Sequence, residues 1–311
     1  MNSINERQND DDCLALLYGQ RITYDKARML WYIYFLIIVF NEIIVYVFSD
    51  KYHENISLVS IVLLLINLVI AWRAREQQNT AVEFQNEFDR RVFGFKDNKL
   101  EILLGELKLQ DQITIKGEKK CFILNKKHLA DESLKNWYSD VSLVKHENTA
   151  IFLCQLECIY WSKKLVHRLI VSCIVFLFIV LALAFLVYSS LQLGFVIKLL
   201  VSSPTIVFLF NFSKKLIVYY DYLKKIEQVE KRFSLMLSEK NDMIEEEEVL
   251  SFQAKQNKLR QISILVPNWF YWRFRETDQL DSQHTTDALI KKIQKHRPEL
   301  LYDGVPRFIL A

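Results

Sequence analysis

The chain has 311 residues, of which 51% are hydrophobic and 25% are charged, and its formal net charge is +3. With only 6 glycines and 4 prolines, it is not a collagen-like, low-complexity or loop-rich β-sandwich protein. The near balance of 40 basic and 37 acidic residues argues against DNA as a partner. The first 20 residues lack the basic and apolar regions of a cleaved signal peptide, so we expect the N-terminus to be retained.

Four apolar runs are long enough to cross a bilayer, whose hydrocarbon core of about 30 Å needs about 20 mostly apolar helical residues. They come as two pairs with short connections, at residues 29–48, 56–72, 169–188 and 195–212. The sequence therefore predicts a mainly α membrane protein with four transmembrane helices in two hairpins, and the lipid bilayer as its surroundings.

Basic residues next to these runs predict the orientation. They lie at the open ends of both hairpins, whereas the two hairpin tips hold only Lys51. Because cytoplasmic loops carry the excess of Lys and Arg, we expect a multi-pass protein with both termini and the middle segment in the cytoplasm. The flanking residues are Arg21, Lys26, Arg28, Arg73, Arg75, Lys163, Lys164, Arg168, Lys214 and Lys215.

This orientation divides the chain into five segments. We expect a cytoplasmic N-terminal segment at 1–28, a transmembrane hairpin at 29–72, a cytoplasmic α or α+β middle segment at 73–168, a second transmembrane hairpin at 169–212 and a cytoplasmic helical tail at 213–311.

The middle segment is expected to begin as a continuation of the second run. Apolar residues recur there at intervals of three and four, which predicts a helix over 81–92 that stops at Gly94. QITIKG and KCFILN, at 112–117 and 120–125, are typical of two strands around a turn. Another helix is predicted at 150–167, leading straight into the third run.

The tail is expected to be helical as well. Apolar residues continue at intervals of three and four from Leu216 to Met236, which predicts that the fourth run extends into the cytoplasm. The pattern predicts further helices at 255–265, before Pro267, and at 286–295.

The sequence carries no motif that indicates an enzyme. It has no Walker loop, dinucleotide-binding glycine motif, HExxH motif, CxxC motif or nucleophile elbow. The 5 cysteines make no disulfide framework, and no further ligands lie at metal-binding spacing. We expect neither catalysis nor a metal or cofactor.

Polar residues inside the apolar runs are candidates for a transmembrane pathway, since charges at membrane depth usually face a bundle interior or water. With both termini in the cytoplasm, Glu42 and Lys198 fall in the outer half of the bilayer and could pair within or between subunits. The alternative is that Lys198 snorkels to the nearby outer surface. The pore-lining candidates are Asn41, Glu42, Asn67, Lys198 and Ser202.

Two cytoplasmic stretches are candidates for binding an anionic ligand. Lys119 and Lys120 belong to a lysine-rich stretch that could form a basic lip for phosphates, or else a solvated face near anionic lipid. Trp269, Arg273 and Arg275 belong to an aromatic stretch that could stack bases and hold phosphates. The alternative for that stretch is a packed or membrane-interface helix.

Five motifs in order along the chain resemble the SMODS-associated four-transmembrane effector family. They are INERQND with the later LLYGQRITYDKA, FQNEFDRRVFGF at 84–95, NWYSD at 136–140, CQLECIYW at 154–161 and PNWFYWRFR at 267–275. The chain departs from the family pattern at Leu156 and Cys158, where the family has Arg and Asn, and at Ser139, where it has Pro. If that Arg and Asn contact a ligand, this protein binds a different one or binds it differently.

The resemblance implies a pore-forming effector of bacterial anti-phage defence in the inner (plasma) membrane. Its expected signal is a cyclic oligonucleotide, made by a functionally linked nucleotidyltransferase and sensed on the cytoplasmic side. Four helices are too few to line a wide aqueous pore, so a homo-oligomer is expected. The alternatives are a non-conducting membrane sensor or scaffold that acts through a protein partner, and a small transporter or membrane enzyme.

Overall fold

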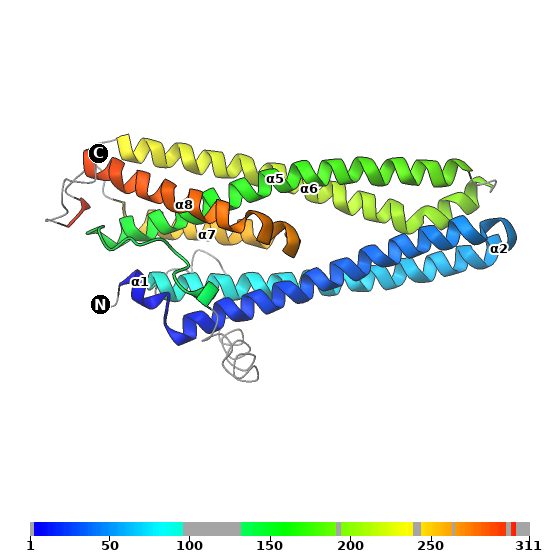
Figure 1. Ribbon diagram of the computed structural model, residues 1–311, viewed down its shortest axis with the longest axis horizontal. Helices are drawn as coiled ribbons and strands as arrows, with labels where there is room; N and C mark the ends of the chain where they lie inside the picture. The colour runs from blue at the N-terminus through cyan, green and yellow to red at the C-terminus, as the bar shows by residue number, and fades with distance from the viewer. Residues whose placement is uncertain are drawn as a thin grey trace.

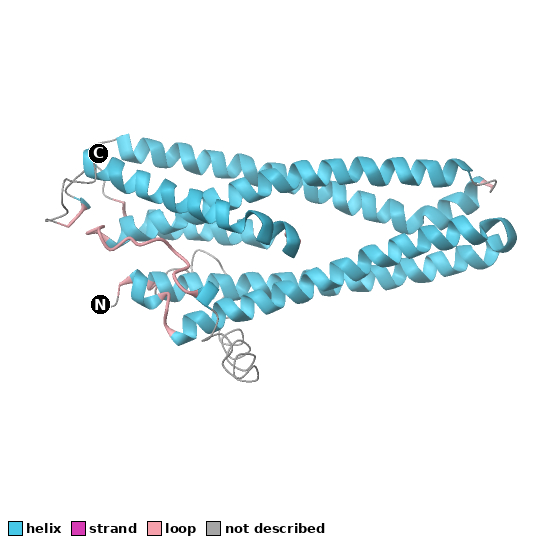
Figure 2. Ribbon diagram, in the orientation of Figure 1, coloured by secondary structure: helices cyan, strands magenta, loops and turns pink. Residues whose placement is uncertain are grey.

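The computed structural model describes residues 3–95, 132–190, 194–238, 244–262, 265–296 and 300–302 (Figure 1). Regular structure in these residues is helical, apart from an isolated bridge between Val144 and Leu301 (Figure 2). The predicted strand pair falls outside the described residues. The helices are α1 (Ile4–Arg7), α2 (Asp11–Phe93), the short 3₁₀ helix η2 (Glu132–Leu134), α5 (Glu147–Ser190), α6 (Phe195–Ser238), α7 (Glu246–Ile262) and α8 (Asn268–His296).

Four helical stretches are long and apolar enough to cross a membrane, and each contains one predicted run. The stretches are Asp11–Phe48 and Asn55–Phe93 in α2, Glu147–Ser189 in α5 and Phe195–Gln228 in α6. All four extend beyond the apolar run itself. The periodic patterns next to the second, third and fourth runs predict this extension, whereas the helix before the first run, from Asp11, was not predicted. The expected four-transmembrane helical layout is therefore confirmed.

The two stretches of α2 are arms that lie side by side and run in opposite directions (Figure 1). At the open end of this hairpin, Arg91 of the second arm pairs with Asp12 of the first at 3.6 Å. Further along, Gly19 lies against the ring of Phe84. The arms therefore approach each other closely well outside the apolar runs.

The parts of the chain outside the apolar runs gather at one end of the molecule, and the hairpin tips lie at the other (Figure 1). We call the described residues outside the runs the head, and the described residues of 29–72 and 169–212 the bundle. Helices α2, α5 and α6 pass from the head into the bundle without interruption.

The second arm of α2 ends where the sequence predicts. Gly94 adopts φ of 67°, a left-handed conformation that glycine reaches without a Cβ penalty. Its N–H and that of Phe95 close the helix on the carbonyls of Arg91 and Arg90, at 3.2 and 3.1 Å. The predicted stop at Gly94 is confirmed.

The last helix is longer than the sequence indicates. The expected short helix at 286–295 is only the end of α8, which begins directly after Pro267 and continues to His296. The middle of α8 has few apolar residues, so no helical periodicity marks it in the sequence. Contacts with α5 support it instead, including the ion pairs Lys164–Asp281 at 2.6 Å and Arg168–Asp278 at 2.5 Å.

The head has a core of its own. Phe84 and Phe88 of α2 are fully buried, and Leu153 and Leu156 of α5 are 1% and 0% exposed. The same cluster includes Val249 of α7 and residues from α1 and α8. Helices from distant parts of the chain are therefore packed together at this end.

The bundle is more open. In the most apolar 18-residue window of α5, none of the residues is buried, so this helix presents its apolar side chains to the surroundings of the protein. Three spans meet in a group of rings that we call the aromatic cluster. Its members are Trp31, Tyr34 and Phe35 of α2, Phe176 of α5, and Phe208 and Phe212 of α6.

Candidate functional site

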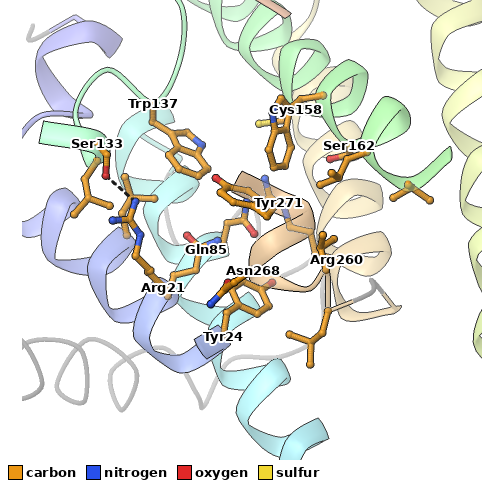
Figure 3. Close-up of a pocket in the computed structure, with 18 of the residues that line it drawn as sticks. Arg21, Tyr24, Gln85, Ser133, Trp137, Cys158, Ser162, Arg260, Asn268 and Tyr271 are labelled. Carbon is orange, nitrogen blue, oxygen red and sulfur yellow. Dashed lines mark hydrogen bonds between the residues drawn. The ribbon is translucent and has the colours of Figure 1, made fainter. Parts of the chain in front are cut away.

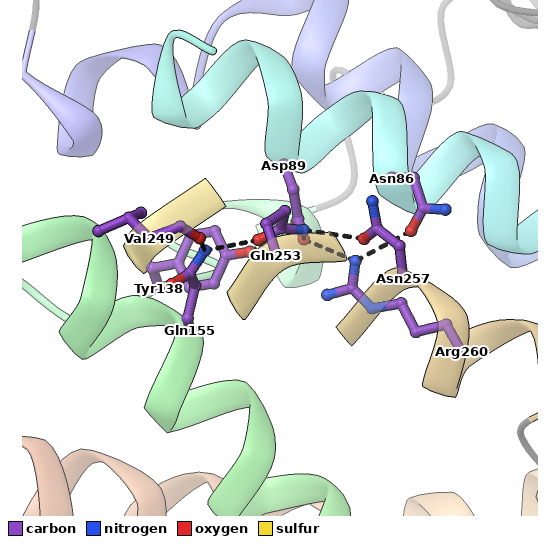
Figure 4. A network of polar contacts seen from close by, with 8 residues as sticks. All are labelled: Asn86, Asp89, Tyr138, Gln155, Val249, Gln253, Asn257 and Arg260. Atoms are coloured by element: carbon purple, nitrogen blue, oxygen red, sulfur yellow. Dashed lines mark hydrogen bonds and ion pairs between the residues drawn. The ribbon is translucent and has the colours of Figure 1, made fainter. Parts of the chain in front are cut away.

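A buried network of polar side chains joins helices of the head (Figure 4). One carboxylate oxygen of Asp89, in α2, accepts a hydrogen bond of 2.6 Å from the Tyr138 hydroxyl. The other oxygen accepts hydrogen bonds from Gln253 Nε2 at 2.8 Å and from Arg260 Nη1 at 2.6 Å. Gln155 of α5 donates to Gln253 Oε1 at 2.8 Å. The network therefore ties α2, α5 and α7 to the segment that carries Tyr138.

Asp89 and Arg260 form a buried ion pair, with side chains 1% and 9% exposed. Burial opposes the charge on Arg260, yet the Asp89 carboxylate outweighs this effect, so the pKa of the guanidinium is raised. Burial, reinforced by Asp89, also raises the pKa of the Tyr138 phenol well above its ordinary value. Tyr138 therefore stays protonated and able to donate.

The segment 136–140 is held from two sides. Asn136 adopts φ of 51°, a left-handed conformation that asparagine tolerates, and it exchanges two hydrogen bonds of 3.0 Å with the Asn9 side chain. Ser139 donates its N–H and its hydroxyl to Glu157 of α5, at 2.9 and 2.7 Å. Several motifs that are far apart in the sequence thus meet in the head.

A cavity of about 290 Å³ lies beside the polar network (Figure 3). The first arm of α2, helices α5, α6 and α7, the segment 133–138 and the start of α8 all contribute to its wall. Aromatic rings are frequent in this wall, among them Tyr24, Trp137, Trp161, Tyr219, Tyr271 and Trp272.

The charged residues of the cavity wall are positive on balance. Arg28, next to the first apolar run, donates to Asp25 at 2.7 Å and to the carbonyl of Val266 at 2.8 Å. Rings and cations together suit a planar, anionic ligand. The cations are Arg21, Arg28, Lys135 and Arg260, and the carboxylates are Asp25 and Glu157.

Two polar atoms of the residues in this wall have no hydrogen-bond partner within the described part of the chain. They are Oε1 of Gln256 and Nη2 of Arg260, on residues one helical turn apart in α7. The two residues are only 7% and 8% exposed. Since a buried polar group without a partner costs about 1–3 kcal/mol, a ligand that supplied these hydrogen bonds would remove that cost.

A second polar site, the Glu42 cluster, lies in the bundle and consists of Asn41, Glu42, Tyr188, Lys198 and Thr205. The Tyr188 hydroxyl donates to both carboxylate oxygens of Glu42, at 2.8 and 2.7 Å. Thr205 of α6 donates to the same carboxylate. Lys198 Nζ donates to the backbone carbonyl of Tyr188 at 3.1 Å. Glu42 therefore joins the first hairpin to both helices of the second.

Pro204 shapes the part of α6 that meets the Glu42 cluster. Because proline has no N–H, the carbonyl of Leu200 loses its helical partner, and the Ser203 hydroxyl donates to it at 2.7 Å. Asn41 of the first hairpin donates to the next carbonyl, that of Val201, at 3.1 Å. The Ser203 hydroxyl thus satisfies the carbonyl that Pro204 leaves without a helical partner, and Asn41 adds a bond from the other hairpin.

The aromatic cluster lies between the cavity and the Glu42 cluster along α2. Neighbouring rings in it have centroids 5.2 to 6.3 Å apart. Arg28 of the cavity wall, Phe35 of the aromatic cluster and Glu42 follow one another at intervals of seven residues, about 10 Å along a helix. The three features are therefore arranged in series.

The predicted pore-lining residues are only partly brought together. Asn41, Glu42 and Lys198 meet, but the described ion pairs do not include Glu42 with Lys198, because Tyr188 joins them instead. Ser202 is 8% exposed and donates to a carbonyl of its own helix. Asn67 is 2% exposed, and its two polar atoms have no hydrogen-bond partner among the described residues.

The predicted ligand-binding residues lie elsewhere than the cavity wall, as far as the structure describes them. Lys119 and Lys120 are outside the described residues. Trp269, 68% exposed, and Arg273, also exposed, belong to α8 but do not line the cavity. The side chain of Arg275 is not described. Binding by these residues stays a prediction.

Sequence reasoning predicted a helix at 255–265, which overlaps α7, but assigned it no role in a site. In α7, the polar residues Gln253, Asn257 and Arg260 recur at intervals of four and three beside the apolar Phe252, the spacing of a face that packs inward. They are 1%, 2% and 8% exposed. Polar residues at core spacing were therefore the signal for the network.

The described residues contain no group of three or more His, Cys, Asp or Glu side chains that could hold a metal ion. Four cysteines in this part of the chain, Cys13, Cys154, Cys158 and Cys173, are free thiols. The two sites are therefore described without a metal.

Comparison with known proteins agrees with the helical layout. Residues 2–289 match the SMODS-associating 4TM effector domain. The chain is 25% identical over 313 residues to a protein of Bacillus cereus (strain VD146) named "Probable CBASS effector molecule", covering 92% of this chain and 98% of that protein. No solved structure matches the chain. Four apolar helices and a match over nearly the whole length identify a membrane protein. The chain therefore belongs to the SMODS-associating 4TM effector family.

Proposed function

We propose that this protein is a CBASS effector that forms a pore in the bacterial inner membrane when the head senses a cyclic oligonucleotide. The family and the Bacillus cereus relative support the effector role. The signal is taken to come from a nucleotidyltransferase that responds to phage. The basic flanks of the apolar runs favour a head, and hence both termini, in the cytoplasm.

One observation carries the proposal: the cavity, the aromatic cluster and the Glu42 cluster follow one another on the same helices. Helices α2, α5 and α6 each contribute to all three. A change at the cavity therefore has an unbroken helical route to the polar site in the membrane.

The contacts in the bundle suit a closed state. The aromatic cluster packs mainly apolar ring surface between the spans, and hydrophobic constrictions gate channels by excluding water. The Glu42 carboxylate is occupied by Tyr188 and Thr205. Opening would part the rings and release this carboxylate into the pathway, which favours cations. The ligand drives this change only if it binds the open state better than the closed one.

A pore also requires several copies of the chain. Four helices of one subunit cannot surround a wide aqueous channel. The span of α5 presents unburied apolar side chains, which another copy could cover in place of lipid. We therefore propose a homo-oligomer in the open state.

The test is release of trapped ions and dyes from liposomes that contain the purified protein, with a panel of cyclic di- and trinucleotides. We expect release with one nucleotide, and a preference for cations that Glu42→Gln removes. Glu227→Gln, a change at an exposed carboxylate of α6 in the head, should leave both properties unaltered. Nucleotide binding without any release would favour a non-conducting sensor or scaffold instead.

A further inference from the structure

The size and lining of the cavity narrow the class of ligand that it can take. Its volume of about 290 Å³ is at the lower end of ligand pockets, which span about 300–1,000 Å³. It suits one base with its sugar rather than a complete cyclic oligonucleotide. Tyr24, Trp137 and Tyr271 surround the same space in Figure 3 and offer faces on which a planar group can stack.

The two unpartnered groups on α7 specify what the planar group must carry. Gln256 Oε1 can only accept a hydrogen bond and Arg260 Nη2 can only donate one. A ligand that satisfies both presents a donor next to an acceptor, as nucleobase edges do. A fatty acyl chain or an unsubstituted ring satisfies neither group.

The charge of Arg260 further favours a base over a phosphate at this point. Its guanidinium is already paired with Asp89 at 2.6 Å, so the positive charge of Arg260 is neutralised by that carboxylate before any ligand binds. A neutral acceptor on a base can pair with Nη2 without adding a second buried anion. The net positive wall nearer the first apolar run, where Arg21 and Arg28 lie, suits the phosphates.

We propose that the protein binds the cyclic oligonucleotide directly, with one of its bases inserted in this cavity and the base edge read by Gln256 and Arg260. This inference rests on the proposed function for the class of its ligand. The base stacks on rings from α2, α8 and the segment 133–138, while the rest of the ring of nucleotides stays at the mouth.

Binding of a base in this cavity would also act on helices that continue into the bundle. The helix that reads the base, α7, is bound through Arg260 and Gln253 to Asp89 of α2. A base between α7 and the first arm of α2 therefore acts on both arms of the hairpin that carries Glu42.

The decisive variant is Gln256→Leu, tested in the full-length protein in nanodiscs. The probes are the four nucleoside 5′-monophosphates and a panel of cyclic di- and trinucleotides. Binding is measured by calorimetry and by quenching of the fluorescence of Trp137 and Trp161, which line the cavity. We expect the variant to bind the preferred nucleotide about tenfold more weakly, the loss of one hydrogen bond.

Thermal stability separates this role from a structural one. Gln256→Leu removes an acceptor that has no partner among the described residues, so the variant should be as stable as the wild type or more stable while its affinity falls. A structural role would instead lower the stability. Arg260→Lys keeps a cation for Asp89 but removes Nη2, and should also weaken binding. Gln261→Leu, at an exposed glutamine of α7 outside the cavity wall, is the matched control and should bind like the wild type.

The outcomes distinguish this inference from the proposed function. Normal affinity and normal nucleotide-triggered release in Gln256→Leu would overturn the cavity as the site and leave the pore intact. Binding that depends on Gln256 without any dye release would support the cavity and overturn the pore. Failure of every probe to bind the wild type would overturn direct sensing.

Discussion

The head and the bundle use polar side chains in opposite ways. In the head, the single carboxylate of Asp89 accepts hydrogen bonds from Tyr138, Gln253 and Arg260. Gln253 in turn accepts a hydrogen bond from Gln155. In the bundle, the two hairpins are joined by the hydrogen bonds of the Glu42 cluster, by a hydrogen bond between the Tyr34 and Asn211 side chains, and by the ring contacts of the aromatic cluster. The head is thus specified by many directional contacts and the bundle by few.

This difference indicates which part can rearrange. Each hydrogen bond of a buried network depends on its neighbours, so partial breakage leaves polar groups unsatisfied. In the membrane, apolar helices meet either lipid or other helices at similar cost, because lipid tails are as apolar as their side chains. We expect the head to stay folded while helices of the bundle change partners.

The largest effect should come from removing the centre of the head's network. Asp89→Ala leaves the buried Arg260 without its counter-charge, which we expect to lower the free energy of unfolding by about 3–5 kcal/mol. Denaturant unfolding in detergent, followed by circular dichroism, measures it. Asp221→Ala, at an exposed residue of α6, should change stability by less than about 0.5 kcal/mol. Equal stability of the two variants would show that the network does not specify the head.

A smaller loss should follow a change at the end of α2. Gly94→Ala forces a residue with a Cβ into φ of 67°, at a cost of about 1–2 kcal/mol. The added Cβ would lie 3.5 Å from the nearest atom, on Arg7, so backbone strain rather than a clash is the cause.

Gly19→Ala is the matched control for this prediction, measured in the same unfolding assay. Gly19 lies inside the helix, where its added Cβ would make an ordinary contact of 3.5 Å with the Phe84 ring. Alanine is the better helix former, by about 0.8–1.0 kcal/mol, so this variant should be as stable or more stable. Equal losses at Gly19 and Gly94 would contradict the strain argument.

In the bundle, one hydroxyl should matter less for stability than for closure. Tyr188→Phe removes the hydrogen bonds to both oxygens of Glu42, and hydrogen bonds between membrane helices contribute about 0.6 kcal/mol on average. We expect roughly threefold more dye release without nucleotide, with cation preference retained. Tyr220→Phe, at an exposed residue of α6, serves as the control. Unchanged basal release would indicate that the Glu42 cluster does not hold the closed state.

The smallest effect is expected where head and bundle meet at the surface. Arg73 and Glu76 form an ion pair of 3.1 Å with side chains 58% and 48% exposed. Water and salt screen such a pair, so Arg73→Gln should change stability by less than about 0.5 kcal/mol. A loss comparable to that of Asp89→Ala would mean that surface charges, rather than buried networks, determine how the head is held.

Local patterns in the sequence account for much of the helical layout. The four apolar runs, the extensions beyond the second, third and fourth runs and the stop at Gly94 all follow from hydropathy, periodicity and glycine geometry within short windows. The length of α8 does not, because its polar middle is held by Asp278 and Asp281 pairing with α5. In the middle of α8, ion pairs with α5 stabilise a helix that no apolar periodicity in the local sequence predicts.

The sequence predicted some residues of the candidate sites but not the sites as a whole. Charge at membrane depth marked Glu42 and Lys198 as unusual residues, but not Tyr188, the group through which they meet. The cavity and its two unpartnered groups on α7 had no motif to mark them.

By itself, the sequence determined where the chain can cross a membrane and which segments continue as helices, since these depend on residues within a few helical turns. Tertiary structure decided which polar groups meet: Asp89 and Arg260 are 171 residues apart, and Glu42 and Tyr188 are 146 apart. Such pairs arise only when packed helices bring their buried faces together, and hydropathy reports the burial of a face but not its partner.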